Sequence, residues 1–205
     1  TVLHLGLNAR VRDNGGGPDA SGGRGPGFRY RARPQTGYGD RFVDTGSLAF
    51  AQDTFYGVEL AGQMNEFGFS AEYGQLQAKP QSGTSLGAFE PTFQGGYFDF
   101  FWSPTGDGRV YNGKDGSFSR VVPKRTLGSD DGIGAIMLGA RYDFLDLTDG
   151  TMDGGEQKGV TLQATWQPLA FLKFQADWSH LDIERPSSPL SGTADTVTIR
   201  SQIEW

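Results

Sequence analysis

Three arginines at alternate positions, Arg29, Arg31 and Arg33, form the part of this sequence with the clearest chemical meaning. In an extended strand, successive side chains point to opposite faces, so the three guanidinium groups share one face and the apolar residues between them share the other. Like charges side by side repel one another, and such a face is stable where it meets water or an anion. Guanidinium groups bind oxyanions through charge-assisted, often bidentate hydrogen bonds. The row therefore predicts a path for anions.

Basic residues elsewhere in the chain are candidates for the same path. Arg10 and Arg12 fall on the polar side of an alternating N-terminal segment, and the segment 35–46 continues from the arginine row. The full set of candidates is Arg10, Arg12, Arg29, Arg31, Arg33, Arg41, Arg120, Lys124 and Arg125. Arg141 and Arg200 also fall on the polar face and would extend the positive electrostatic field along this path. The alternative for each single arginine is an ion pair with a carboxylate on its own face, such as Glu59, Glu72, Asp99 or Asp143.

Strands are the elements that would position these side chains. Leu3, Leu5 and Leu7 alternate with polar or small residues, and the same two-residue period recurs along the chain. Segments of about ten residues with this alternation, separated by turn-forming residues, are typical of transmembrane β-barrels. The pattern predicts an all-β fold, an antiparallel transmembrane β-barrel with residues 1–205 as one domain. The predicted strands are 1–12, 27–34, 50–64, 66–79, 94–103, 134–146, 158–167, 171–182 and 196–205.

The composition of the 205 residues excludes several classes of protein. Without cysteine, the chain has no disulfide framework, thiolate zinc site or cysteine nucleophile. The net charge of −6 argues against a nucleic-acid-binding surface spread over the whole chain. The 32 glycines, 13% aromatic residues and mean hydropathy of −0.45 suit either a soluble all-β domain or a barrel whose lipid face uses every second residue. No apolar run approaches the roughly 20 residues of a transmembrane helix.

No arrangement of residues predicts an enzyme, a cofactor or a metal site. His4 and His180 are the only histidines and lie far apart in the sequence. The Gly-rich run 14–27 lacks the Lys-Ser/Thr pair that completes a phosphate loop, and we interpret it as a flexible connection. The Asp-rich segment 143–153 lacks the spacing of a calcium loop, although weak calcium binding at the surface stays open.

Aromatic residues and connection lengths favour a membrane barrel over a soluble sandwich. Several apolar rows end in an aromatic residue, such as Trp102 and Trp205, where the interfacial girdles of a barrel would lie. Tight turns such as 64–66 alternate with longer connections, as in barrels. The longer connections are 80–92, 148–157 and 185–194. The connection 105–131 falls on the side of the tight turns but is far too long for one. It is either a solvated loop or a segment folded into the lumen, where its basic residues narrow the pore.

Several short motifs resemble those of the phosphate-selective porin family. They are RYRARP at 29–34, DRFVDTG at 40–46, YGVELA at 56–61 and SFSRV at 117–121. The match follows the family's order along nearly the whole chain and corresponds to the C-terminal half of such a porin. Members of this family are 16-stranded trimeric barrels in which lumenal arginines pass anions to a constriction rich in basic side chains. The resemblance implies that the arginine row belongs to this ladder. Lys124 falls where the family places a basic residue after a similar Arg-Val motif, whereas Val122 departs from the basic character expected nearby.

The resemblance also implies a function. It indicates an outer-membrane porin of a Gram-negative bacterium with a water-filled channel for passive, anion-preferring diffusion and with selectivity for phosphate. The implied partners are small inorganic anions, membrane lipid, further copies in a homotrimer and the N-terminal remainder of the barrel, with no nucleic acid. Nine strands cannot close an antiparallel barrel, and a free strand edge is not tolerated in lipid, so we expect only the C-terminal portion of the wall. Two alternatives remain open: a non-transporting structural barrel and a soluble carbohydrate-binding β-sandwich.

Overall fold

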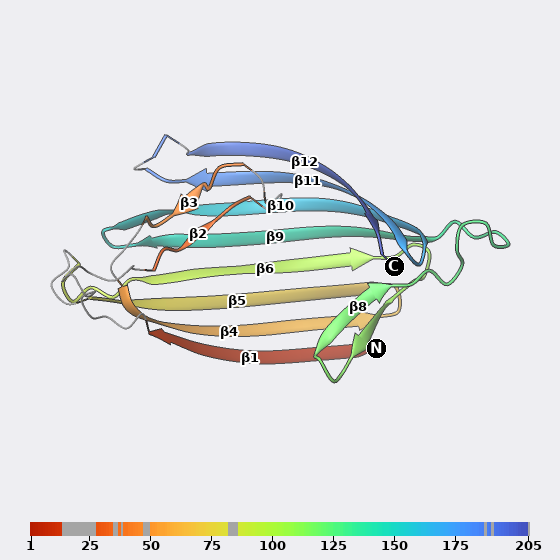
Figure 1. Ribbon diagram of the computed structural model, residues 1–205, viewed down its shortest axis with the longest axis horizontal. Coiled ribbons are helices and arrows are strands. Elements are labelled where there is room, and N and C mark those ends of the chain that lie inside the picture. Colours follow the sequence, from red (N-terminus) through yellow and green to blue (C-terminus); the bar gives the residue numbers. More distant parts are fainter. Residues whose placement is uncertain are drawn as a thin grey trace.

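An antiparallel sheet of eight strands, in the order β1-β4-β5-β6-β9-β10-β11-β12, dominates the fold (Figure 1). The computed structural model describes residues 1–13, 28–34, 37, 39–46, 50–81, 86–186, 188–189 and 191–204. The strands of the sheet are β1 (Val2–Asp13), β4 (Phe50–Met64), β5 (Phe67–Pro80), β6 (Thr92–Trp102), β9 (Ala135–Asp149), β10 (Met152–Leu169), β11 (Leu172–Glu184) and β12 (Gly192–Ile203). None of the described residues forms a helix long and apolar enough to cross a membrane. Since β1 and β12 do not pair with each other, the sheet is open.

Two small hairpins lie against one face of this sheet. β2 (Arg31–Ala32) pairs with β3 (Val43–Asp44), and β7 (Arg109–Asn112) pairs with β8 (Ser117–Val121). Figure 1 shows both hairpins in front of the long strands, with β2–β3 toward the longer connections and β7–β8 at the end that carries the tight turns. We call the face that they cover the inner face.

The opposite, outer face is apolar and exposed, as the two-residue period predicts. Register keeps the apolar side chains together: Leu5 lies opposite Leu60, and Phe98 opposite Tyr142. Leu7 and other large apolar residues of the edge strands are the most exposed, with 81% of Leu7 accessible. Aromatic rings stack on this face near the tight turns; Phe67 contacts Trp102, and Trp166 contacts Phe174. Burying such a surface in hydrocarbon is worth roughly 25 cal/mol per Å².

A compact apolar cluster lies on the inner face, at the end toward the longer connections. Its buried members are Val43, Phe50, Ala78, Phe93 and Leu147. Phe28, Tyr30 and Ala32 pack against it. The apolar side of the arginine segment therefore faces the sheet and not the membrane.

This packing corrects the prediction of a wall strand at 27–34, whereas the other predicted strands are confirmed as the eight of the sheet. Of its described residues, 28–34, Arg31–Ala32 alone forms a strand, and this strand pairs with β3. Alternation alone does not distinguish a strand between lipid and water from a segment between a protein core and water. The expected long loop at 148–157 is also wrong, because β9 and β10 extend into it and leave a tight turn at Gly150–Thr151. The run 14–27 and Trp205 lie outside the described residues.

Candidate functional site

The β7–β8 hairpin crosses the inner face and is anchored at both edges of the sheet. The Tyr111 hydroxyl shares a hydrogen bond of 2.7 Å with Nδ1 of His4 on β1, and Nε2 of His4 lies 2.9 Å from Glu59 on β4. The side-chain amide of Gln63 makes two hydrogen bonds of 3.0 Å with the backbone of Arg109. From β8, Arg120 forms an ion pair with Glu204, next to the end of β12. The connection 105–131 therefore places its hairpin over the polar side of the sheet.

The β2–β3 hairpin holds the arginine row at the other end of the inner face. Arg29 makes a bidentate pair with Asp44 of β3, at 2.7 and 2.5 Å. This hydrogen bonding lowers the pKa of the Asp44 carboxyl. The Tyr30 hydroxyl donates to Asp53 of β4 at 2.8 Å, and burial raises the pKa of Tyr30. These contacts fix the backbone of the row against the sheet.

The three arginines of the row have different partners. Arg29 is neutralised by Asp44, and Arg33 donates to the carbonyl oxygen of Gly39 at 2.9 Å. Arg31 is exposed and has no hydrogen bond or ion pair with any described residue. Arg41 lies close enough that, after desolvation, the charges of Arg31 and Arg33 lower its pKa further. An excess of positive charge therefore remains at this end of the inner face.

A hollow of about 590 Å³ lies beside the row, and we call it the Arg31 hollow. Its cationic lining comes from two hairpin residues and three wall residues: Arg10, Arg12, Arg29, Arg31 and Arg141. Arg12 is neutralised by Asp53, with Nε 3.0 Å from Oδ1. Arg10 lies over the ring of Phe55, with 5.6 Å to its centroid, and forms no ion pair among the described residues, although its charge acts on Asp53.

A second hollow of about 490 Å³, the Arg200 hollow, lies further along the inner face. Arg141 lines both hollows and joins them. Its guanidinium lies 3.4 Å from Asp99 and 3.8 Å from Asp143, and it stacks over the ring of Tyr97 at 3.9 Å. Arg200 donates to the amide oxygen of Gln175. Carboxylates thus neutralise part of the cationic lining of this hollow. For Arg141, this arrangement corresponds to the alternative that single arginines pair with carboxylates on their own face.

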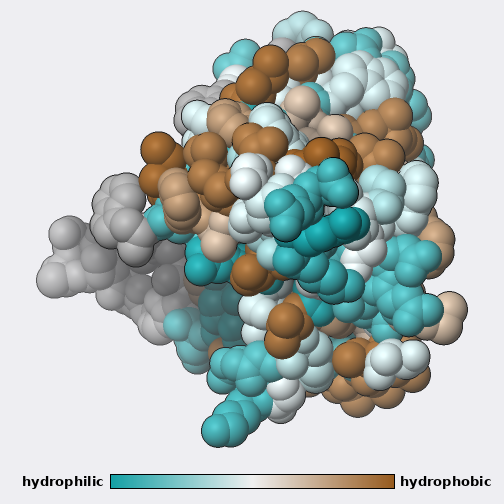
Figure 2. Space-filling model, turned by 90° about the vertical axis from the view of Figure 1, so that its right-hand side faces the viewer, coloured by the Kyte–Doolittle hydropathy of each residue, from teal (hydrophilic) through white to brown (hydrophobic). Residues whose placement is uncertain are grey.

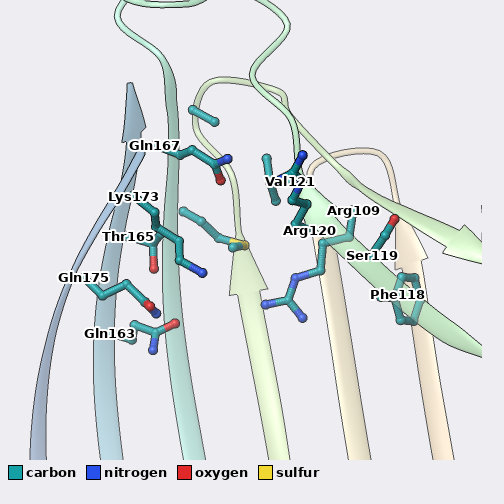
Figure 3. A pocket seen from close by; sticks show the side chains of 12 residues that line it. Arg109, Phe118, Ser119, Arg120, Val121, Gln163, Thr165, Gln167, Lys173 and Gln175 are labelled. Atoms are coloured by element: carbon teal, nitrogen blue, oxygen red, sulfur yellow. The ribbon is translucent and has the colours of Figure 1, made fainter. Parts of the chain in front are cut away.

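The third hollow, of about 220 Å³, lies between β8 and the strands β10 and β11, and we call it the Lys173 hollow. Figure 3 shows Arg109 of the hairpin and Lys173 of β11 pointing toward one another across it. Arg109 also lines the Arg200 hollow and stacks on Phe101, with 4.7 Å to the ring centroid. Burial lowers the pKa of the Arg109 guanidinium. Cationic side chains therefore follow one another along the inner face, from the arginine row to the tight-turn end.

The structure brings some predicted residues together and leaves others apart. Four of the predicted residues share the Arg31 hollow: Arg10, Arg12, Arg29 and Arg31. Arg120 lines the separate Lys173 hollow and is paired with Glu204. Lys124 and Arg125 line none of the three hollows; Lys124 donates to the carbonyl oxygen of Gly106. Arg33, the third arginine of the row, and its neighbour Arg41 do not line the Arg31 hollow.

The role of Arg109 was not predicted from the sequence. Arg109, which lines two hollows, lies in a segment without strand periodicity, so no sequence signal separated it from its basic neighbours. In the described part of the chain, no group of three or more His, Cys, Asp or Glu side chains is arranged to hold a metal ion, and the aspartates of 143–153 are no exception. Asp149 instead accepts a hydrogen bond of 2.7 Å from the backbone of Thr92.

A curved antiparallel wall that is apolar outside and polar inside, with an inward-folded segment, defines a protein of the porin class. A family model for phosphate-selective porin O and P matches residues 1–205, and the chain belongs to this family. A curated protein of Caulobacter vibrioides, described as an uncharacterized protein, is 36% identical over 196 residues, which cover 95% of this chain. The chain spans 37% of the length of that relative.

Proposed function

We propose that this chain forms part of the wall of a water-filled outer-membrane channel for anions, with phosphate among them. The observation that supports this proposal most directly is the succession of cationic side chains along the inner face. Arg10, Arg31 and Arg109 form no ion pair with a carboxylate among the described residues. An anion that loses water in a narrow passage finds replacement hydrogen bonds and charge at such groups.

The proposed channel needs strands in addition to those described here. β1 and β12 are the two ends of the sheet, and each would present unpaired backbone groups to lipid. We propose that further strands pair with these edges, that the complete wall is a barrel of 16 strands, and that three copies associate in the outer membrane of a Gram-negative bacterium. Family membership supports each of these proposals.

The exposed outer face weighs against a soluble sandwich. A second sheet would have to cover residues such as Leu7 and Ile199, which are each 81% exposed, and the described part of the chain contains no such sheet. A barrel would partition into detergent and migrate faster on a gel before boiling than after it. A sandwich would remain in the aqueous phase.

The experiment that tests the function is a selectivity measurement on the full-length protein in planar bilayers. Reversal potentials in a potassium chloride gradient should show a preference for chloride, and added phosphate should reduce the chloride current. A preference for potassium would refute the anion channel, and the absence of conductance would favour a structural barrel. Chloride preference without phosphate block would leave an anion channel without the proposed selectivity.

A further inference from the structure

The Lys173 hollow differs from the other two in its charge. Arg109, Arg120 and Lys173 line it, and none of its described lining residues is a carboxylate. Arg120 is neutralised by Glu204, which leaves Arg109 and Lys173. Neither of these two side chains makes an ion pair or hydrogen bond within the described part of the chain, although each is partly buried.

Arg109 and Lys173 point toward one another across the hollow (Figure 3). The carboxylate whose charge acts on Arg109, that of Asp99, lines the neighbouring Arg200 hollow and not this one. Arg109 comes from the hairpin and Lys173 from the wall, so their approach is set by the anchors of the hairpin at His4 and Glu204. Partial burial strengthens the attraction of both cations for an anion, because it lowers the local dielectric constant. An anion held between Arg109 and Lys173 would interact with both.

The remaining lining is rich in neutral hydrogen-bonding groups. The hydroxyl of Thr165, a residue only 6% exposed, has no hydrogen-bond partner among the described groups. Gln163 donates its amide nitrogen to Asp177 at 2.7 Å, and Gln167 donates to the carbonyl oxygen of Ala170 at 3.2 Å. Both glutamines thereby present their amide oxygens as acceptors. Gln175 accepts from Arg200 and keeps its amide nitrogen as a donor.

An unprotonated phosphate oxygen only accepts hydrogen bonds, so it suits the two cations but not the amide oxygens of the glutamines. Inorganic phosphate has its P–OH donors on the same phosphorus as its charge, whereas an organic phosphate adds C–OH groups at a distance from the charge. A hydroxyl group both donates and accepts, so it matches the amides and the unpaired hydroxyl of Thr165. The volume of about 220 Å³ lies below the roughly 300–1,000 Å³ of sites for drug-sized ligands, so the ligand is small.

We propose that the Lys173 hollow is a binding site for a small hydroxylated organic phosphate, with the phosphate between Arg109 and Lys173 and the hydroxyls on Thr165 and the glutamines. This site rests on the proposed anion channel and names a substrate class for it. Glycerol 3-phosphate is a suitable probe, because inorganic phosphate and glycerol each carry one half of its chemistry.

The test measures block of the chloride current by these three compounds in planar bilayers that contain the full-length protein. Glycerol 3-phosphate should block at a lower concentration than inorganic phosphate, and glycerol should not block. Arg109→Gln and Lys173→Gln should each raise the half-blocking concentration of both phosphates by about tenfold or more, the usual effect of losing a charge-assisted hydrogen bond. Lys114→Gln, which removes a charge from the exposed end of the same hairpin, is the matched control and should change neither.

Thr165→Val separates the hydroxyl contribution from the charge contribution. This near-isosteric change removes an unpaired buried hydroxyl and should leave the fold intact. It should raise the half-blocking concentration of glycerol 3-phosphate by about fivefold, the effect of one neutral hydrogen bond, and leave that of inorganic phosphate unchanged. Equal block by both phosphates, with no effect of Thr165→Val, would overturn the organic-phosphate site while the anion channel stands. A preference for cations would instead refute the channel itself.

Discussion

Replacement of Gly68 by alanine tests how the wall positions Arg109. Gly68 on β5 lies directly opposite Phe101 on β6, and the Phe101 ring covers it. A Cβ atom at Gly68 would lie 2.1 Å from the Phe101 ring, where carbon atoms normally approach to about 3.5 Å, so the ring must move by about 1.4 Å or more. The Arg109 guanidinium lies over this ring, 4.7 Å from its centroid, so movement of the ring should move Arg109 as well.

The expected cost of Gly68→Ala is that of overpacking a core position, about 1–3 kcal/mol of unfolding free energy. Gly139 on β9 provides a matched control, because it also lies opposite Phe101, from the other side. A Cβ atom there would lie 3.6 Å from its nearest neighbour, an ordinary contact. Gly139→Ala should therefore be neutral, or stabilising by about 0.4–1 kcal/mol through a less flexible unfolded chain.

The assay is urea unfolding of both variants in the same detergent, followed by block of the chloride current by phosphate. Gly68→Ala should lower the unfolding midpoint and weaken the block, and the second change Phe101→Leu should restore part of the stability by making room. Equal midpoints for the two alanine variants would refute the reasoning that the Phe101 ring depends on the glycine beneath it. Unchanged block in a destabilised Gly68→Ala variant would show that Arg109 is not positioned by the ring.

Three further predictions concern the hairpins. Arg31→Gln should lower the preference for chloride over potassium by up to about fivefold, because a unit charge 4 Å from an ion is worth about 1 kcal/mol in water. Reversal potentials measure this preference, and Arg125→Gln is the control. Tyr111→Phe removes the hydrogen bond to His4 and should lower the free energy of opening the β7–β8 hairpin by about 0.5–1.5 kcal/mol. Amide hydrogen exchange in residues 109–121 should become faster, and unchanged exchange would contradict this prediction. Because the pKa of Asp44 is lowered, its ion pair with Arg29 stabilises the β2–β3 hairpin to its full extent at pH values above the ordinary carboxyl pKa. This stabilisation is lost as the pH falls through the lowered pKa of Asp44. Proteolysis near residues 40–46 should therefore rise in strong acid, and Asp44→Asn should show that sensitivity already at neutral pH.

The two-residue period predicted the wall well because lipid on one side and water on the other impose it on every spanning strand. The same period misplaced residues 27–34, since Phe28 and Tyr30 satisfy it by packing on the inner cluster. For the site, spacing identified Arg10, Arg12, Arg29 and Arg31, which share a hollow. It did not single out Arg109, because the position of this side chain depends on tertiary contacts with Gln63 and Phe101 that no local pattern encodes.

The anchors of the β7–β8 hairpin also bear on the order in which the protein assembles. The contact between Tyr111 and His4 joins residues 107 positions apart, and that between Arg120 and Glu204 joins residues 84 positions apart. Contacts between residues this distant in sequence form late, because chain entropy must first be lost in the intervening segments. The second contact requires the end of β12, the last strand of the sheet. Arg109 therefore takes up its position in the lumen only after the strands around it have formed. A barrel that is not yet complete would accordingly be a wider and less selective opening than the complete one.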